Sequence, residues 1–526
     1  ALVELADDPS AHDRLQTVTL DGREHFVFLQ SLREGSDGEL FAVVTPVAAM
    51  LAPALAKVQR SVLLTGLLLL LLVPLVYWLA RFIVVPIRQL SAENDKIIAR
   101  RYDALTPVSS HIVEIDDLGS SMHRMAKAIE RHLHEQEALM DAFVKVIADA
   151  IDQKSPYTGG HCRRVPQLAL MLAEKAQVSR EAPFDAFAFR DEHEWREFRI
   201  GAWLHDCGKI TTPEHVVDKG VKLETIHNRI HEIRTRFEVL WRDAEIDALE
   251  ARLADCRAGV DRDDEHAATL ARRRQQLRDD FAFIAACNDG EARMDTEALA
   301  RLDALAGITW QRHFDDRLGL SAPERARREG EGESLPATES LLADKPWHRI
   351  PHTREVAYDP RLGIRMPVPE YLYDLGELHN LKVTRGTLSR EERFKIQEHV
   401  IGTIKILDKL PLPEELKRVP RYASTHHETL DGHGYPRRLT GKDLSIPERI
   451  MVLADIFEAL TASDRPYKST KRVSEAIEIL HRMVEDDHVD RDVFELFLES
   501  GVYLDYARRF LQESQIDTVD LSRYRR

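Results

Sequence analysis

The alternation of apolar and polar positions divides the chain into four successive parts. Residues 1–57 contain an alternating run at 25–30 and an apolar run at 40–44, a pattern typical of strands. Residues 61–80 contain no charged side chain and consist mainly of Leu and Val. Residues 84–133 show two helical patterns with a polar break between them, and helical spacing dominates residues 134–526. We expect a mainly α-helical protein with an α/β part at its N-terminus.

The uncharged segment predicts one transmembrane helix over residues 58–83, because about 20 apolar residues span a bilayer as a helix. Tyr77 and Trp78 lie at its end, where aromatic residues meet a membrane interface. More Lys and Arg residues follow the segment than precede it, which predicts a cytoplasmic C-terminal part. A buried helix of a soluble protein is the alternative. Because the chain opens on Ala1, we expect that part of the N-terminus is missing.

Charge and cysteine usage narrow the classes of function. The net charge of −16 argues against a nucleic-acid-binding surface, which needs a basic patch. The four cysteines include no Cys-x-x-Cys pair, so neither a disulfide framework nor a cysteine zinc site is expected. A small anionic substrate stays compatible with this composition, because it needs only a few local cations.

Histidine and aspartate recur in five separate motifs of the C-terminal part. The candidate metal ligands are His161, His205, Asp206, His399, His426, His427 and Asp455. Asp206 and Asp455 stand in strongly apolar stretches, and a buried carboxylate needs a cation or a full set of donors. Each residue taken singly also has a structural explanation. Together they suffice for two octahedral metals such as iron, manganese or zinc, with Asp206 as a natural bridge.

These motifs resemble the HD phosphohydrolase superfamily. His161, His205-Asp206 and Asp455 match its metal-binding pattern, while His399, His426-His427 and Gly434-Tyr435-Pro436 resemble the added signature of the HD-GYP subfamily. The resemblance implies an all-α HD-type domain over residues 134–526. It also implies hydrolysis of cyclic di-GMP to pGpG and/or GMP by a hydroxide that two divalent metal ions, Fe or Mn, activate.

The resemblance also assigns roles to further residues. Asp206 and Lys209 would be catalytic, and Lys209, Arg465 and Lys468 would hold the substrate phosphates. We expect Glu428 and Asp431 to orient the histidines. The residues Gly434, Tyr435 and Pro436 would shape a turn or dock a protein partner.

The N-terminal parts resemble components of bacterial membrane sensors. Residues 1–57 resemble the last strands of an extracytoplasmic Cache domain, and a small juxtamembrane cap without a ligand is the alternative. Residues 84–133 resemble a HAMP relay, in which Pro86 would open the first helix and Glu114–Gly119 would lead into the second. A helix continuing through Phe143 would form a dimeric stalk. The implied protein is a homodimer in the bacterial inner membrane with a cytoplasmic catalytic domain.

Two departures from the family pattern bear on substrate and metal number. Tyr157 stands where relatives with a third metal carry Glu, which predicts a two-metal site. The family's Lys-Pro-Gly loop is split by an insertion at about 225–373, with an expected helical hairpin and a mobile loop at 321–345. Two alternatives therefore stay open. One is a two-metal hydrolase of another cyclic dinucleotide or nucleotide phosphate, and the other is a weakly active receptor that acts through partners.

Overall fold

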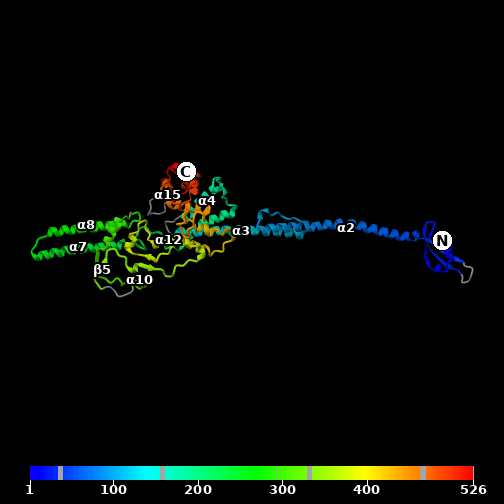
Figure 1. The fold of residues 1–526 in the computed structure, drawn as a ribbon, viewed down its shortest axis with the longest axis horizontal. Helices are drawn as coiled ribbons and strands as arrows, with labels where there is room; N and C mark the ends of the chain where they lie inside the picture. The colour runs from blue at the N-terminus through cyan, green and yellow to red at the C-terminus, as the bar shows by residue number, and fades with distance from the viewer. Residues whose placement is uncertain (33–38, 155–159, 293, 329–333, 463–469, 525–526) are drawn as a thin grey trace. The chain divides into compact units, whose positions relative to one another are not determined.

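The computed structural model describes residues 1–32, 39–154, 160–292, 294–328, 334–462 and 470–524 (Figure 1). Packing separates the chain into two units, residues 1–137 and residues 138–526. Each unit is described by itself. The described residues are mainly helical, which confirms the predicted fold class.

The first unit begins with the short helix α1 (Leu2–Ala6) and a three-stranded antiparallel sheet. Its strands are β1 (Leu15–Leu20), β2 (Arg23–Ser31) and β3 (Leu40–Pro46), in the order β1-β2-β3. Val27 and Leu29 alternate with more exposed residues along β2 and are both buried, as period-two alternation requires. The strands predicted at 25–30 and 40–44 are confirmed.

Helix α2 (Val47–Ile98) is the one described helix that is long and apolar enough to cross a membrane. The length and composition of α2 allow a membrane span, which stays a prediction. The expectation that Pro86 opens a new helix is wrong, because α2 runs without interruption through Pro53, Pro74 and Pro86. Proline only removes one backbone hydrogen bond and kinks a helix, so a long apolar helix can continue through it.

The segment 99–112 connects α2 to α3 (Val113–Lys154) and packs against both helices. The Glu93 carboxylate on α2 accepts hydrogen bonds from the Thr106 backbone N–H at 2.9 Å and from its hydroxyl at 2.8 Å. A Cβ atom on Gly119 would lie 2.7 Å from the carbonyl oxygen of Val108, so this close approach requires glycine. The arrangement of helix, connector and helix agrees with the pattern read from the sequence, and its assignment as a HAMP relay stays a prediction.

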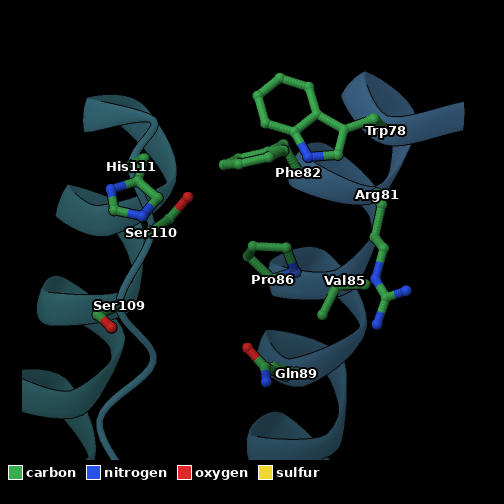
Figure 2. A pocket seen from close by; sticks show the side chains of 9 residues that line it. All are labelled: Trp78, Arg81, Phe82, Val85, Pro86, Gln89, Ser109, Ser110 and His111. Atoms are coloured by element: carbon green, nitrogen blue, oxygen red, sulfur yellow. The ribbon is translucent and has the colours of Figure 1, made fainter. Parts of the chain in front are cut away.

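Between α2 and the connector lies an open pocket of about 450 Å³. Figure 2 shows the Phe82 ring of α2 directed toward His111 of the connector, and their ring centroids are 5.9 Å apart. Trp78 packs edge-on against Phe82 at 4.4 Å. The pocket therefore has an aromatic wall at the end of the most apolar stretch of α2.

The second unit has a helical core around α4 (His161–Val178) and α14 (Ile446–Thr461), which pack against each other. The other core helices are α5 (Glu192–Leu204), α6 (Glu214–Val217), α11 (Glu377–Leu381), α12 (Arg390–Leu407), α13 (Val419–Ala423), α15 (Val473–Glu485), α16 (Arg491–Glu499) and α17 (Val502–Phe510). Leu168 and Leu172 of α4 and Phe457 of α14 are fully buried in this core. Such burial contributes about 1.5–3 kcal/mol for each large apolar side chain and fixes the two helices that carry His161 and Asp455.

The insertion forms a subdomain with its own core. It consists of a hairpin of α7 (Ile230–Ala258) and α8 (Asp263–Cys287), followed by α9 (Thr296–Ala306) and α10 (Ala322–Arg327), with the paired strands β4 (Thr309–Arg312) and β5 (Ala337–Ser340) and the paired strands β6 (Arg349–Pro351) and β7 (Tyr371–Asp374). Ile233, Ile284 and Leu302 are completely buried in its core. Residues 321–345, where a mobile loop was expected, include α10 and β5 among the described residues, and the mobility of this segment stays a prediction.

The insertion leaves and rejoins the core at neighbouring points. The Thr387 hydroxyl donates a hydrogen bond to the Lys219 carbonyl oxygen at 3.1 Å. The Lys219 ammonium donates to both carboxylate oxygens of Glu392 on α12, at 2.8 and 2.7 Å, in a fully buried ion pair. The two halves of the split Lys-Pro-Gly loop are therefore brought together in space.

Candidate metal centre

The expected metal ligands come from five elements that meet at one point of the helical core. His161 begins α4, and His205-Asp206 follows the end of α5. His399 lies on α12, and Asp455 lies on α14. The pair His426-His427 lies in the turn after α13. All of them are buried except His427, whose side chain is 27% exposed.

One group of ligand atoms forms around His161 and His205. The Nε2 atom of His161 lies 3.2 Å from Asp206 Oδ2 and 3.3 Å from Asp455 Oδ1. The Nε2 atom of His205 lies 3.4 Å from the same oxygen of Asp206 and 3.8 Å from the same oxygen of Asp455. Ligand atoms of His161, His205 and Asp455 lie within 4.8 Å of one another. We call these three residues together with Asp206 Oδ2 the first cluster.

A second group forms on the other side of the Asp206 carboxylate. Ligand atoms of His399, His426 and His427 lie within 4.8 Å of one another. The other oxygen of Asp206, Oδ1, lies 3.2 Å from His399 Nε2 and 3.9 Å from His426 Nε2. His427 Nδ1 lies 4.0 Å from Asp455 Oδ2. We call the three histidines together with Asp206 Oδ1 the second cluster.

Unsatisfied atoms at the centre test whether metal ions fit. Among the described residues, Asp206 Oδ1, His399 Nε2 and His426 Nε2 are buried atoms without a hydrogen-bond partner. Leaving each of them unsatisfied would cost about 1–3 kcal/mol, and a shared cation removes that cost. The donor set of imidazole nitrogens and carboxylate oxygens suits divalent transition metals. The residues therefore fit two divalent ions, with one oxygen of Asp206 for each.

Hydrogen bonds at Nδ1 orient four of the imidazole rings. His205 Nδ1 faces the carbonyl oxygen of Ala202 at 2.8 Å, His399 Nδ1 faces that of Ile396 at 2.5 Å, and His426 Nδ1 faces that of Ala423 at 3.1 Å. His161 Nδ1 instead faces the Glu458 carboxylate. Because Nδ1 must donate to a carbonyl oxygen in the first three contacts, Nε2 of His205, His399 and His426 is directed at the centre as a metal ligand would be.

Sequence reasoning missed Glu458 and Arg164, which hold His161 from behind. Glu458 is 1% exposed and accepts a hydrogen bond from Arg164 Nε at 2.7 Å in addition to the contact with His161. Burial raises the pKa of Glu458, but His161 and Arg164 outweigh it and lower the pKa to about 2. The sequence signal for both residues was their helical spacing. Glu458 lies three residues after Asp455, and Arg164 lies three residues after His161, so each lies on the same helix face as an expected metal ligand.

Two imidazoles of the second cluster, those of His426 and His427, are kept neutral by their buried surroundings. Burial lowers the pKa of His426 well below the usual value, and neighbouring His427 and His205 lower it further. Burial likewise lowers the pKa of His427 to about 3. Neutral imidazole binds a metal without first releasing a proton. His426 and His427 can therefore bind a cation at neutral pH.

In the first cluster, nearby carboxylates favour the charged form of His161. Burial lowers the pKa of His161, but Glu458, Asp206 and Asp455 outweigh it and raise the pKa well above the usual value. Lys209 Nζ lies 2.6 Å from Asp206 Oδ2, and burial of Asp206 is outweighed by Lys209 and His205, which lower its pKa well below the usual range. Positive charge therefore stabilises the carboxylates of the first cluster, and a divalent ion would supply such charge.

Glu428 and Asp431 have different partners from those expected. The fully buried Glu428 carboxylate accepts hydrogen bonds from the backbone N–H groups of Arg437 at 2.7 Å and Leu439 at 2.8 Å. Asp431 accepts from the backbone N–H of His433 and faces its Nδ1, both at 2.9 Å. The described contacts of both carboxylates therefore shape the loop after the His-His pair rather than orienting an imidazole of either cluster.

The Gly434-Tyr435-Pro436 motif lies against the second cluster and against the insertion. A Cβ atom on Gly434 would lie 2.4 Å from the Thr429 nitrogen, so the chain passes itself closely there. The Tyr435 ring stacks on that of His427 with centroids 4.7 Å apart. The Arg365 N–H of the insertion donates to the Pro436 carbonyl at 2.8 Å. A protein partner at this motif stays a prediction.

Three residues named from the sequence lie outside the described residues. They are Tyr157, which motivates the two-metal expectation, and Arg465 and Lys468, which were expected to hold phosphates. The number of metals and the phosphate-binding roles therefore stay predictions.

Comparison with known proteins gives the class of the C-terminal part. Residues 336–493 match the model of a family described as HD domain. The match includes the three histidines of the second cluster and Asp455, while His161 and His205-Asp206 precede it. The expected HD-type domain is therefore confirmed for this part of the chain.

Several named relatives match part of the chain. The chain is 32% identical over 149 residues to 3′3′-cGAMP-specific phosphodiesterase 1 of Vibrio cholerae, a match that covers 27% of this chain and 34% of that protein. It is 38% identical over 112 residues to 3′3′-cGAMP-specific phosphodiesterase 3 of the same species, covering 21% and 24%. It is 35% identical over 108 residues to the cyclic di-GMP phosphodiesterase of Thermotoga maritima, covering 20% and 29%. The matches thus span about a third or less of each relative.

Proposed function

We propose that the second unit is a two-metal phosphodiesterase that hydrolyses cyclic di-GMP to pGpG and/or GMP. One observation carries the proposal: the two oxygens of Asp206 are directed at separate groups of imidazole nitrogens. A buried carboxylate shared in this way suits a pair of metals better than any single ion. The names of the relatives support a cyclic dinucleotide as the substrate.

The residues at hand would bind and orient the reacting phosphodiester. The first and second clusters would hold two divalent ions, iron or manganese, which supply an activated water and neutralise charge at phosphorus when bound. Lys209 keeps its proton, since Asp206 outweighs the effect of burial and raises the pKa of the Lys209 ammonium. Its charge lies beside the shared carboxylate, where it would attract a phosphate oxygen. Tyr435 fixes the His427 ring at the more open side of the centre.

The proposed setting is a homodimer in the bacterial inner membrane with the second unit in the cytoplasm. The apolar length of α2 supports a membrane span. Leu139, Phe143 and Val146 are each more than half exposed and recur along α3 at the 4-3 spacing of a coiled-coil seam. That stripe supports a second copy of the chain as the partner.

The decisive experiment measures turnover by the chain of residues 1–526 in detergent, loaded anaerobically with Fe²⁺ or Mn²⁺, beside the variant Asp206→Asn. Loss of a group that merely orients a ligand costs about 10–100-fold, so loss of the shared ligand should exceed about 100-fold. Metal-dependent formation of pGpG or GMP in the parent and its loss in the variant would support the proposal. No turnover of any cyclic dinucleotide by the parent with two bound metals would refute it.

A second substrate has specific support. Two of the relatives named above are 3′3′-cGAMP-specific, and the loop that begins at Lys219 is interrupted by the insertion. The same assay with cyclic di-GMP and 3′3′-cGAMP in separate reactions ranks the two substrates by kcat/KM. A preference for 3′3′-cGAMP would keep the two-metal mechanism and replace the substrate.

A further inference from the structure

The last turn of α3 holds the backbone on both sides of the first metal ligand. Asp152 is buried, and its two carboxylate oxygens accept hydrogen bonds from the backbone N–H groups of Gly160 at 3.0 Å and Cys162 at 3.1 Å. These two residues flank His161. Because Gly160 has no side chain to cap α4, Asp152 supplies the carboxylate that a capping residue would otherwise provide.

Lys154, the final residue of α3, holds the backbone of the turn that follows Asp206. Lys154 Nζ donates to the carbonyl oxygens of Lys209 at 3.1 Å, Ile210 at 2.6 Å and Thr212 at 2.6 Å. An ammonium group has three N–H donors, so these contacts use all of them. The carbonyls belong to the short turn that directly follows Asp206 and carries Lys209. Lys154 therefore fixes the end of the segment that supplies the shared carboxylate.

An apolar face of α3 packs between the same two segments. Val144, Ala148 and Ile151 are buried in one cluster with Cys162 and Cys207. Cys162 adjoins His161, and Cys207 adjoins Asp206. Rotation or sliding of α3 would therefore displace both ligand segments together, since a close-packed interior transmits small shifts rather than absorbing them.

We propose that Asp152 and Lys154 are positioning residues that tie the separation of His161 and Asp206 to the position of α3. They act through backbone groups and do not touch the substrate. A shift of α3 would then change turnover and the metal affinity of the first cluster. It would reach the second cluster only through the shared Asp206 carboxylate, because α12 and the turn after α13 hold the three histidines. The effect on turnover rests on the proposed function, and the effect on metal affinity does not.

The test compares matched variants of residues 1–526 in detergent. Asp152→Asn removes one of two acceptor oxygens, and Lys154→Met removes all three donors. Asp149→Asn is the control for the first, because Asp149 also joins α3 to α4 but through the exposed Arg163 side chain, at 2.6 and 2.7 Å. Lys154→Arg is the control for the second, because guanidinium can still donate to several carbonyls. Calorimetry with Mn²⁺ gives metal affinity, and steady-state assays give kcat and KM separately.

We expect Asp152→Asn to weaken one of the two Mn²⁺ binding events by about 10-fold, because His161 belongs to the first cluster alone. Lys154→Met should weaken both events, because Asp206 faces both clusters. Each variant should lower kcat with KM unaltered. Asp149→Asn should change affinity by no more than about twofold, because exposed ion pairs contribute little, and Lys154→Arg should recover part of the loss. Equal effects of Asp152→Asn and Asp149→Asn, or no effect of Lys154→Met, would overturn the inference. If the parent hydrolyses no cyclic dinucleotide, the proposed function fails while the Mn²⁺ affinities still decide this inference.

Discussion

Replacing Glu458 by Gln should weaken metal binding at one cluster only. Glu458 is 1% exposed and contacts His161 Nδ1 and Arg164 Nε in the described structure. The amide oxygen of Gln can still accept one hydrogen bond, but the charge assistance, which makes such a bond about twice as strong, is lost. Removing partners of this kind costs about 10–100-fold in metal affinity, or about 1.4–2.7 kcal/mol. We expect the lower end of this range, because the 18% exposed Arg164 side chain can turn toward water.

The assay is a calorimetric titration of the metal-free chain with Mn²⁺, in which two binding events are expected. Glu458→Gln should shift one event and leave the other unchanged. Glu428→Gln provides the contrast, because it alters a buried carboxylate whose described partners are backbone N–H groups, and it should not shift the event that Glu458→Gln shifts. An unchanged titration of Glu458→Gln, or equal weakening of both events, would refute the assignment of Glu458 to the first cluster.

Three further predictions concern the stability of the second unit, the space around Gly208 and the pH dependence of folding. Lys219→Met should destabilise the second unit by about 3–5 kcal/mol in urea unfolding, because it leaves Glu392 buried without its ion-pair partner. The double variant Lys219→Met/Glu392→Leu should recover most of this loss. A double variant as unstable as the single one would contradict the prediction. Gly208→Ala should abolish Mn²⁺ binding, because its Cβ would lie 1.8 Å from a backbone carbonyl oxygen of α12; wild-type binding would contradict it. A hydrogen bond to Glu391 raises the pKa of His379. The pair should therefore stabilise the fold fully below the unfolded histidine pKa and lose this effect as pH rises through the raised pKa. His379→Gln should flatten the free energy of unfolding across this pH range, and an unchanged pH profile would refute the pairing.

The sequence was sufficient for the candidate ligands because their residue types are chemically distinctive. Burial of adjacent histidines such as His426-His427, or of Asp206 within an apolar stretch, costs free energy unless polar partners are present, and a metal centre provides such partners. The sheet and the long apolar helix were also predictable, since periodicity and length reflect local preferences.

The supporting groups depend on distances that only the folded chain defines. Glu458 and Asp152 are ordinary acidic residues on helices, and their roles arise because α14 and α3 come to lie beside α4. The same holds for Arg365, which reaches Pro436 across the fold from within the insertion. The continuity of α2 through Pro86 was mispredicted because proline is a common helix start, and a long apolar helix overrides that preference.

The contact between Lys219 and Thr387 has a consequence for how this chain could be rebuilt. A segment whose two ends touch adds little to the entropic cost of folding its host, because closure has already been achieved by the core. We therefore expect that joining Gly220 to Gly386 through a short linker, which removes α11 together with the insertion, would keep the two clusters together. The same junction would accept a foreign domain, such as a fluorescent reporter, without stretching the helices that carry the two clusters.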